Sequence, residues 1–170
     1  MAKTVGALMS MEASGKFGGA ITFDRRGYAR VYKIPANPQT AGQGDVRQRL
    51  AAVQAVAKLL SVTAVTAIKA VSVPSYRWNS FVVKNAIGSG SAQYTAALGV
   101  WTALSSGEKT SWNGAFATVA VPDNSYATMA APTSGEAAFI VATGLFAAGL
   151  FQATAVPSAS NYAAWATALL

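Results

Sequence analysis

Three short motifs of one kind divide most of the chain into helical segments. Each has Ser or Thr at its first position and Gln or Glu at its fourth, at residues 40–43, 105–108 and 133–136. In such a capping box the hydroxyl accepts an amide hydrogen from the first helical turn, and the longer side chain reaches back to the amide of the capping residue. Because apolar residues at helical spacing follow each motif, the sequence predicts a mainly α protein, a small helical bundle.

The first predicted helix follows Thr40. Its apolar residues fall in one stripe; they are Val46, Leu50, Val53, Ala57 and Leu60. Residues 61–73 are rich in Val, Thr and Ile, so a strand or a helix capped by Ser61 would fit them. The interleaved alanines favour the helix, and Pro74 ends the segment.

The rest of the chain alternates helices with turns. Helices are predicted at residues 76–87, 93–104, 106 to about 121, and from about 158 to 170, with a loop at 122–132. Residues 137–156 are apolar over nearly the ~20 residues that a bilayer span needs. Gln152 interrupts them and neither Lys nor Arg flanks them, so a buried core helix is favoured over a membrane span.

A β-hairpin is predicted at residues 17–34. Aromatic and aliphatic residues alternate in both halves, and the sequence Asp-Arg-Arg-Gly at 24–27 supplies the turn. A lone hairpin is only marginally stable in water. This N-terminal arm and hairpin, residues 1–39, is therefore expected to pack on the helices or on a neighbouring subunit.

The remaining chain is interpreted as two degenerate helical repeats, residues 40–90 and residues 91–170, the second including the C-terminal helix. An offset of 44 pairs Ser61 with Ser105 and Ile68 with Trp112. An offset of 58 pairs residues 81–83 with 139–141. Chance similarity among alanine-rich helices is the alternative. In either case the expected architecture is one compact domain.

Several classes of chemistry lack their usual side chains. The sequence has no Cys and no His, and its six carboxylates are scattered singly, so we expect no enzyme, no metal and no cofactor. Ser106 and Lys109 match the S-x-x-K spacing of some serine hydrolases, but the accompanying S-D-N and K-T-G motifs are absent. A helix start is the simpler interpretation. The tryptophans are expected in the core or at a subunit interface; they are Trp78, Trp101, Trp112 and Trp165.

Positive charge is concentrated near the N-terminus. Residues 1–49 hold eight Lys or Arg against three acids, and residues 50–170 hold five against three. The predicted interaction site combines the basic residues of the hairpin and first helix with two tyrosines; it comprises Arg25, Arg26, Arg30, Lys33, Arg47, Arg49, Tyr28 and Tyr32. Such a site favours an acidic partner surface, either protein or DNA.

Five runs of sequence resemble one known family. They are S-G-K-F-G-G at 14–19, R-G-Y-A-R at 26–30, N-P-Q-T at 37–40, V-R-Q-R-L at 46–50 and W-T-A-L-S at 101–105. Together they resemble a family of small tailed-phage and prophage proteins. The resemblance covers about residues 14–150. The sequence departs from the family pattern at Ile68, where the family has a tryptophan.

This resemblance implies a virion structural protein, assembled in the host cytoplasm and located in the virion. The expected role is a minor capsid, cement or decoration protein that binds the major capsid protein lattice, as a homo-oligomer or in many copies. A head–tail connector or tail component, binding other virion subunits, is the close variant. A non-specific DNA-binding protein is the alternative from another class. No membrane partner is expected.

Overall fold

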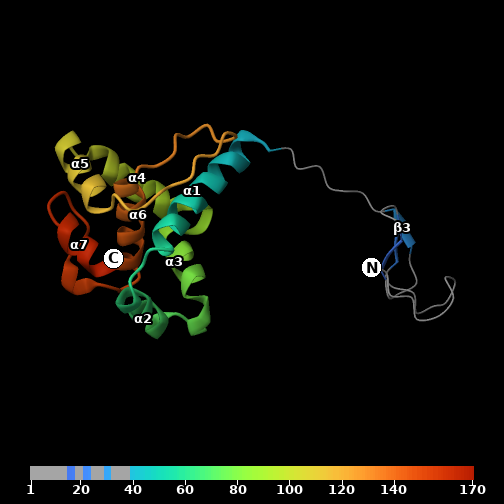
Figure 1. Cartoon of the computed structure of the whole chain (residues 1–170), viewed down its shortest axis with the longest axis horizontal. Coiled ribbons are helices and arrows are strands. Elements are labelled where there is room, and N and C mark those ends of the chain that lie inside the picture. The colour runs from blue at the N-terminus through green and yellow to red at the C-terminus, as the bar shows by residue number, and fades with distance from the viewer. Residues whose placement is uncertain (1–14, 18–20, 24–28, 32–38) are drawn as a thin grey trace. The chain divides into compact units, whose positions relative to one another are not determined.

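The computed structural model describes the backbone of residues 15–17, 21–23 and 29–31, and residues 39–170 in full. The chain forms two units, residues 1–38 and residues 39–170 (Figure 1).

Three short strands make up the described part of the N-terminal unit. β1 (Gly15–Phe17), β2 (Ile21–Phe23) and β3 (Ala29–Val31) are antiparallel in the order β1-β2-β3. Ile21 pairs with Val31, and Phe23 pairs with Ala29. The predicted turn lies outside the described residues, as do Arg25, Arg26, Tyr28, Tyr32, Lys33 and the side chain of Arg30. The hairpin of residues 17–34 therefore stays a prediction.

Helix α6 (Ser134–Ala147) is the central element of the helical unit (Figure 1). Side chains on every side of it are buried between Ala137 and Leu145. The helices that pack directly on it are α1 (Ala41–Ala57), α3 (Trp78–Ile87), α4 (Ala92–Ala103) and α5 (Ser106–Ala115). In addition, α2 (Val62–Val71) packs on α3, and α7 (Tyr162–Leu169) packs on α5. The prediction of a mainly helical protein with a buried apolar helix is confirmed.

The apolar segment 137–156 nevertheless does not form one long helix. The amide of Gly149 donates to the carbonyl of Phe146 at 2.9 Å. The next amide, of Leu150, donates to the carbonyl of Leu145 at 3.0 Å. These two bonds form a Schellman motif, in which the glycine takes a left-handed conformation, here with φ of 83°. Leu150 is buried, so the turn returns the following apolar residues to the core.

The predicted apolar stripe of the first helix is wrong at its N-terminal end. Val46 is 59% exposed, whereas Gln48 is fully buried. The reason is that a polar loop covers this end of α1, and Gln48 Nε2 donates to the carbonyl of Pro122 at 2.8 Å. Farther along the helix, Val53 and Ala57 are buried as predicted.

The predicted extent of the helix after Ser105 is also wrong, because α5 ends at Ala115 instead of near residue 121. Phe116 leaves the helical conformation, with φ of −114° and ψ of 27°. The amide of Val119 then donates to the carbonyl of Phe116 at 2.9 Å. Phe116 and Val119 are both buried. Apolar residues three positions apart can both be buried in such a turn, just as they can in a helix, so their spacing does not distinguish the two.

Helices α2 and α5 have the same length and equivalent caps. Their bounds differ by 44 residues at both ends. Ser61 and Ser105 are their N-caps, and each hydroxyl accepts an amide hydrogen from the first turn. Ile68 and Trp112 occupy equivalent positions, and both are fully buried. Residues 62–71 are therefore a helix and not a strand.

Helices α3 and α6 approach closely enough for their backbones to touch. A Cβ added to Gly144 would lie 2.6 Å from the Cα of Ala86 and 2.6 Å from the carbonyl oxygen of Asn85. The offset of 58 places Ala86 and Gly144 at equivalent positions. The two helices related by this offset thus pack on each other through equivalent residues.

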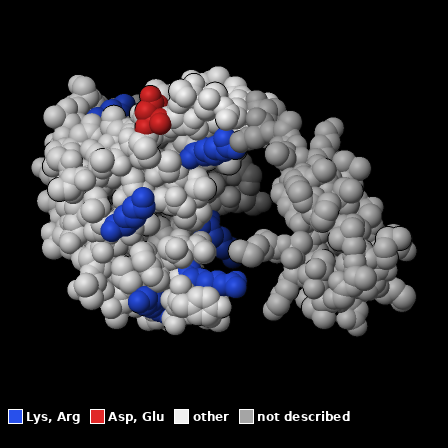
Figure 2. All heavy atoms as spheres, turned by 45° about the vertical axis from the view of Figure 1, so that its right-hand side comes forward, with Lys and Arg blue, Asp and Glu red and all other residues white. Residues whose placement is uncertain are grey.

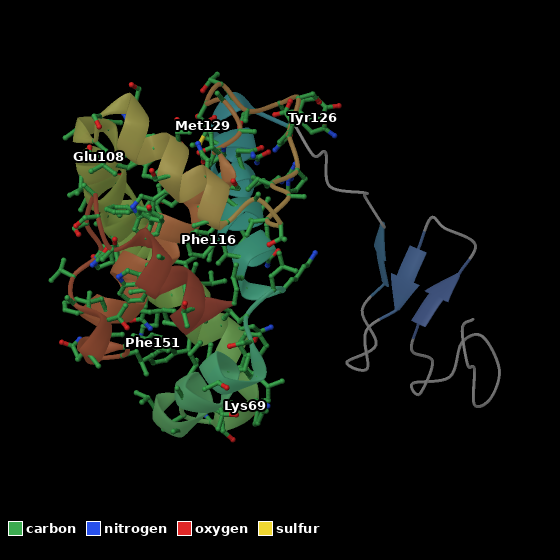
Figure 3. The ribbon with its side chains drawn as sticks, turned by 60° about the vertical axis from the view of Figure 1, so that its left-hand side comes forward. Lys69, Glu108, Phe116, Tyr126, Met129 and Phe151 are labelled. Atoms are coloured by element: carbon green, nitrogen blue, oxygen red, sulfur yellow. The ribbon has the colours of Figure 1, made fainter. Side chains whose placement is uncertain are left out.

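Asp45, at the start of α1, accepts hydrogen bonds from the loop that precedes α6. Its carboxylate accepts hydrogen bonds from the amide of Thr128 at 2.7 Å, from the Thr128 hydroxyl at 2.8 Å, and from the amide of Met129 at 3.0 Å. Gly44 allows the close approach, because a Cβ there would overlap the carbonyl of Tyr126. Figure 3 shows Met129 and Tyr126 beside this end of α1.

Acidification is expected to release this loop. The Met129 amide, followed by the Thr128 hydroxyl, lowers the pKa of Asp45 below its ordinary value of 3.8. Because the folded pKa is the lower one, the stabilisation is complete above the unfolded pKa and is lost as pH falls through the folded pKa. Hydrogen exchange should show the amides of Thr128 and Met129 losing protection below about pH 4.

The variant Asp45→Asn should lose the same amide protection at neutral pH, since a neutral amide oxygen is a weaker acceptor than a carboxylate. Asp123→Asn is the matched control, because its carboxylate accepts a local hydrogen bond from the amide of Asn124 at 2.9 Å. Full protection of Thr128 and Met129 in Asp45→Asn would contradict the role given to Asp45.

Candidate interaction surface

A groove of about 680 Å³ lies among α1, α2 and α3. Its apolar lining consists of Leu50, Ala57, Leu60, Val65, Trp78 and Val83. Its polar lining consists of Gln54, Lys58, Asn79, Ser80 and Lys84, all of them exposed. An apolar floor within a polar rim is the usual composition of a binding site.

The groove lies in a part of the chain that has no carboxylates. Between Asp45 and Glu108 the sequence has six Lys or Arg and no Asp or Glu. Lys58 and Lys84 line the groove, and neither Asp nor Glu is among the described residues that line it. Figure 2 shows Lys and Arg side chains spread over one face of the helical unit, with acidic side chains visible near its upper edge. An acidic group would therefore be attracted by the lysines of the groove and would meet no acidic neighbour among its described lining residues.

Helix α2 forms one wall of the groove and exposes apolar side chains. Val62 at its start is 84% exposed, and Val73 just beyond its end is 94% exposed. Val62, Val65 and Lys69 lie on one side of the helix, since successive residues turn by about 100°, and Figure 3 shows Lys69 at this end of the unit. Exposed valines beside an apolar groove are typical of a surface that another molecule covers.

The opposite end of the helical unit has a different surface. Helix α5 lies there (Figure 1), and it exposes small polar residues such as Ser106 and Thr110. Helices α2 and α5 have equivalent caps and length, so the contrast comes from the side chains alone. The exposed valine at the start of α2 therefore distinguishes it from the equivalent helix α5.

Two of the predicted interaction residues lie on α1. Arg47 is exposed, but Arg49 is half-buried, with its guanidinium carbon 5.5 Å from the ring centroid of Tyr94. Tyr94 is fully buried. Burial, together with the smaller effect of the charge of Glu136, raises the pKa of Tyr94 to about 12, and Arg49 opposes the rise. Arg49 therefore has a packing role on the core. The other six predicted residues lie outside the described side chains.

Sequence reasoning missed most of the residues that line the groove, above all Lys58, Val65 and Lys84. The absence of acids between Asp45 and Glu108 was the available signal. A charge count over residues 50–170 conceals it, because that range also includes the three acids from Glu108 onward.

The S-x-x-K segment is a helix start, as predicted. Ser105 is the N-cap of α5, and its amide donates to Glu108 Oε2 at 2.6 Å in a complete capping box. Hydrogen bonds to Ser105 lower the pKa of Glu108. The bond with the Ser105 hydroxyl has the larger effect and the bond with its amide the smaller one. Lys109 Nζ donates to the carbonyl of Thr102 at 2.9 Å. Within the described part of the chain, no three His, Cys, Asp or Glu side chains gather where they could hold a metal ion.

Three of the four tryptophans are core residues, as predicted. Trp112 and Trp165 are fully buried, and Trp101 is nearly so. Trp78 differs, because it is half-buried and lines the groove.

In the described part of the chain, no one helix is both long and apolar enough to cross a bilayer. Helices α1 and α2 meet those two criteria only when taken together, and they are bent by 115° where they join.

Comparison of the chain with protein-family models, with curated proteins and with solved structures gives no match.

Proposed function

We propose that this protein is a structural component of a tailed-phage virion, which binds a neighbouring subunit as a minor capsid, cement or decoration protein. The observation that carries the proposal is the groove of α1, α2 and α3, with exposed valines beside it and no acid among the described residues that line it. A protein that is added to a lattice needs such an uncovered surface with an apolar centre. The sequence resemblance over residues 14–150 supports the same role. A head–tail connector or tail component is the close variant.

The predicted hairpin of residues 17–34 would supply a second contact. Its edge strand could extend a sheet of a neighbouring subunit. The basic residues on it would then face the acidic surface of that subunit; they are Arg25, Arg26, Arg30 and Lys33. In this proposal the hairpin and the groove bind separate sites on the lattice.

The helical unit is proposed to consist of two degenerate repeats, residues 40–90 and residues 91–170. The equal lengths of α2 and α5, and the serine N-cap of each, support this proposal. The contact between Ala86 and Gly144, which are equivalent under the second offset, supports it as well. In this arrangement the order helix, serine-capped helix and helix occurs twice, and α3 and α6 join the repeats.

A non-specific DNA-binding protein is the competing proposal. The same lack of acids between Asp45 and Glu108 would ease the approach of phosphate groups. Affinity for duplex DNA would then fall steeply with salt concentration, because bound counterions are released on binding.

Mass spectrometry and gel densitometry of purified particles test the proposed role. Roughly tens to hundreds of copies per particle are expected for a capsid, cement or decoration protein, because it occupies equivalent lattice positions. About six or twelve copies would favour the connector variant. Absence of the protein from mature particles would overturn both.

A further inference from the structure

We infer that the groove of α1, α2 and α3 holds a segment of another protein chain that presents an apolar side chain beside one or more carboxylates. The inference deepens the proposed structural role and rests on it for one point, that the partner is another virion subunit. Its physical basis is the composition of the groove and of its surroundings.

The shape of the groove favours an inserted side chain. A volume of about 680 Å³ lies within the range of known ligand sites, roughly 300–1,000 Å³. Val65 and Val83 line it from α2 and α3, and the half-buried ring of Trp78 adds a flat aromatic wall. Such a lining binds Leu, Phe or a similar side chain by excluding water from both surfaces.

The proposed repeat relation between the two halves supplies a reason for the open groove. Under the offset of 44, Ala57 in the groove corresponds to Trp101. Trp101 is buried, and its ring lies 5.7 Å from that of Phe139. In the proposed repeats the second half thus has an indole at the sequence position where the first half has the methyl group of Ala57. The inserted side chain of the partner would take the corresponding place in the first half.

Charge determines what should flank the inserted side chain. Lys58 stands on the α1 side of the groove and Lys84 on the α3 side, while Lys69 lies farther along α2. Each exposed ion pair raises affinity only by about two- to threefold at low salt, and it also steers and orients an approaching partner. Carboxylates on either side of the apolar side chain are thus the expected flanking groups.

The exposed valines of α2 favour a polypeptide over a small molecule. Val62 shares one side of α2 with Val65 of the groove, so the apolar surface continues beyond the groove. A small anion would leave that surface uncovered. A peptide segment bound in the groove could continue across Val62 and shield it from water.

Selection from a random peptide display library on the intact protein tests the inference. Enriched peptides are expected to carry a large apolar residue with Asp or Glu nearby. Val65→Trp, which fills the groove, should abolish their binding. Lys58→Gln combined with Lys84→Gln should weaken it roughly five- to tenfold at low salt, the effect of losing two exposed ion pairs.

The matched control is Ala103→Glu combined with Ser106→Glu. It changes the net charge by the same amount at two exposed positions of α4 and α5, and it should leave peptide affinity unchanged. Circular dichroism establishes that each variant is folded. If a variant at Val65 does not fold, Val83→Trp replaces it, because Val83 lines the same groove from α3.

Three results would overturn the inference. The first is that the enriched peptides lack Asp and Glu. The second is that the enriched peptides bind the lysine and tryptophan variants with the same affinity as the original chain. The third is that a labelled DNA duplex binds through Lys58 and Lys84. The outcome is independent of the particle measurement. A groove that binds acidic peptides in a protein absent from virions would keep the binding site and reject the virion role.

Discussion

Replacing Gly144 with alanine is expected to destabilise the helical unit by about 3 kcal/mol, the upper range for an added methyl group in a packed core. The new Cβ would lie 2.6 Å from the Cα of Ala86 and from the carbonyl oxygen of Asn85. Both are backbone atoms of α3, so no side chain can rotate away to make room. Helix α3 would have to move away from α6, and the surrounding core contacts would loosen.

Gly99→Ala is the matched control for this prediction. Gly99 is also in the interior of a helix, α4, but a Cβ there would meet nothing within 4 Å. Alanine should therefore stabilise the protein by up to about 1 kcal/mol through its helix propensity. Urea unfolding of the two variants should give changes of opposite sign. Equal or greater stability of Gly144→Ala would show that α3 and α6 do not touch as described.

Trp112→Ala is expected to cost about 3–5 kcal/mol, the range for a large aromatic side chain removed from a core. The indole is fully buried, stacks on Phe116 at 5.6 Å and meets Phe139 edge-on at 5.1 Å. Its Nε1 also donates to the carbonyl of Ser158 at 2.9 Å. The alanine variant would lose the ring contacts and leave that carbonyl without its donor.

Trp78→Ala provides the comparison, because this tryptophan is half-buried and borders the groove. Its removal should cost much less, about 1 kcal/mol, since water already reaches part of the ring. Thermal unfolding followed by circular dichroism measures both variants under one set of conditions. Similar losses at the two positions would be inconsistent with a core centred on Trp112 and α6.

The helical architecture could be predicted because its signals are local. A serine or threonine cap fixes where a helix begins, and the hydroxyls of Thr40, Ser61, Ser105 and Thr133 all accept amide hydrogens at helix starts in the structure. Helix ends were less predictable. The turn after Ala115 buries Phe116 by the same spacing that a continuing helix would use.

The groove could not be predicted because it depends on contacts between distant residues. Ala57, Val65 and Val83 are ordinary apolar positions in their own helices, and only the packing of α1, α2 and α3 leaves a space among them. The burial of Gln48 has a similar origin, since its partner is the carbonyl of Pro122, 74 residues away. Hydropathy along the sequence carries no information on such pairings.

The position of α6 in the chain has a consequence for biosynthesis. Four helices that precede it, α1, α3, α4 and α5, bury their apolar faces on it. While the ribosome is still translating the codons before residue 134, those helices lack the partner that would cover them. Folding of the helical unit is thus delayed until α6 emerges from the exit tunnel. Until then the nascent chain presents its uncovered alanines, valines and tryptophans to chaperones.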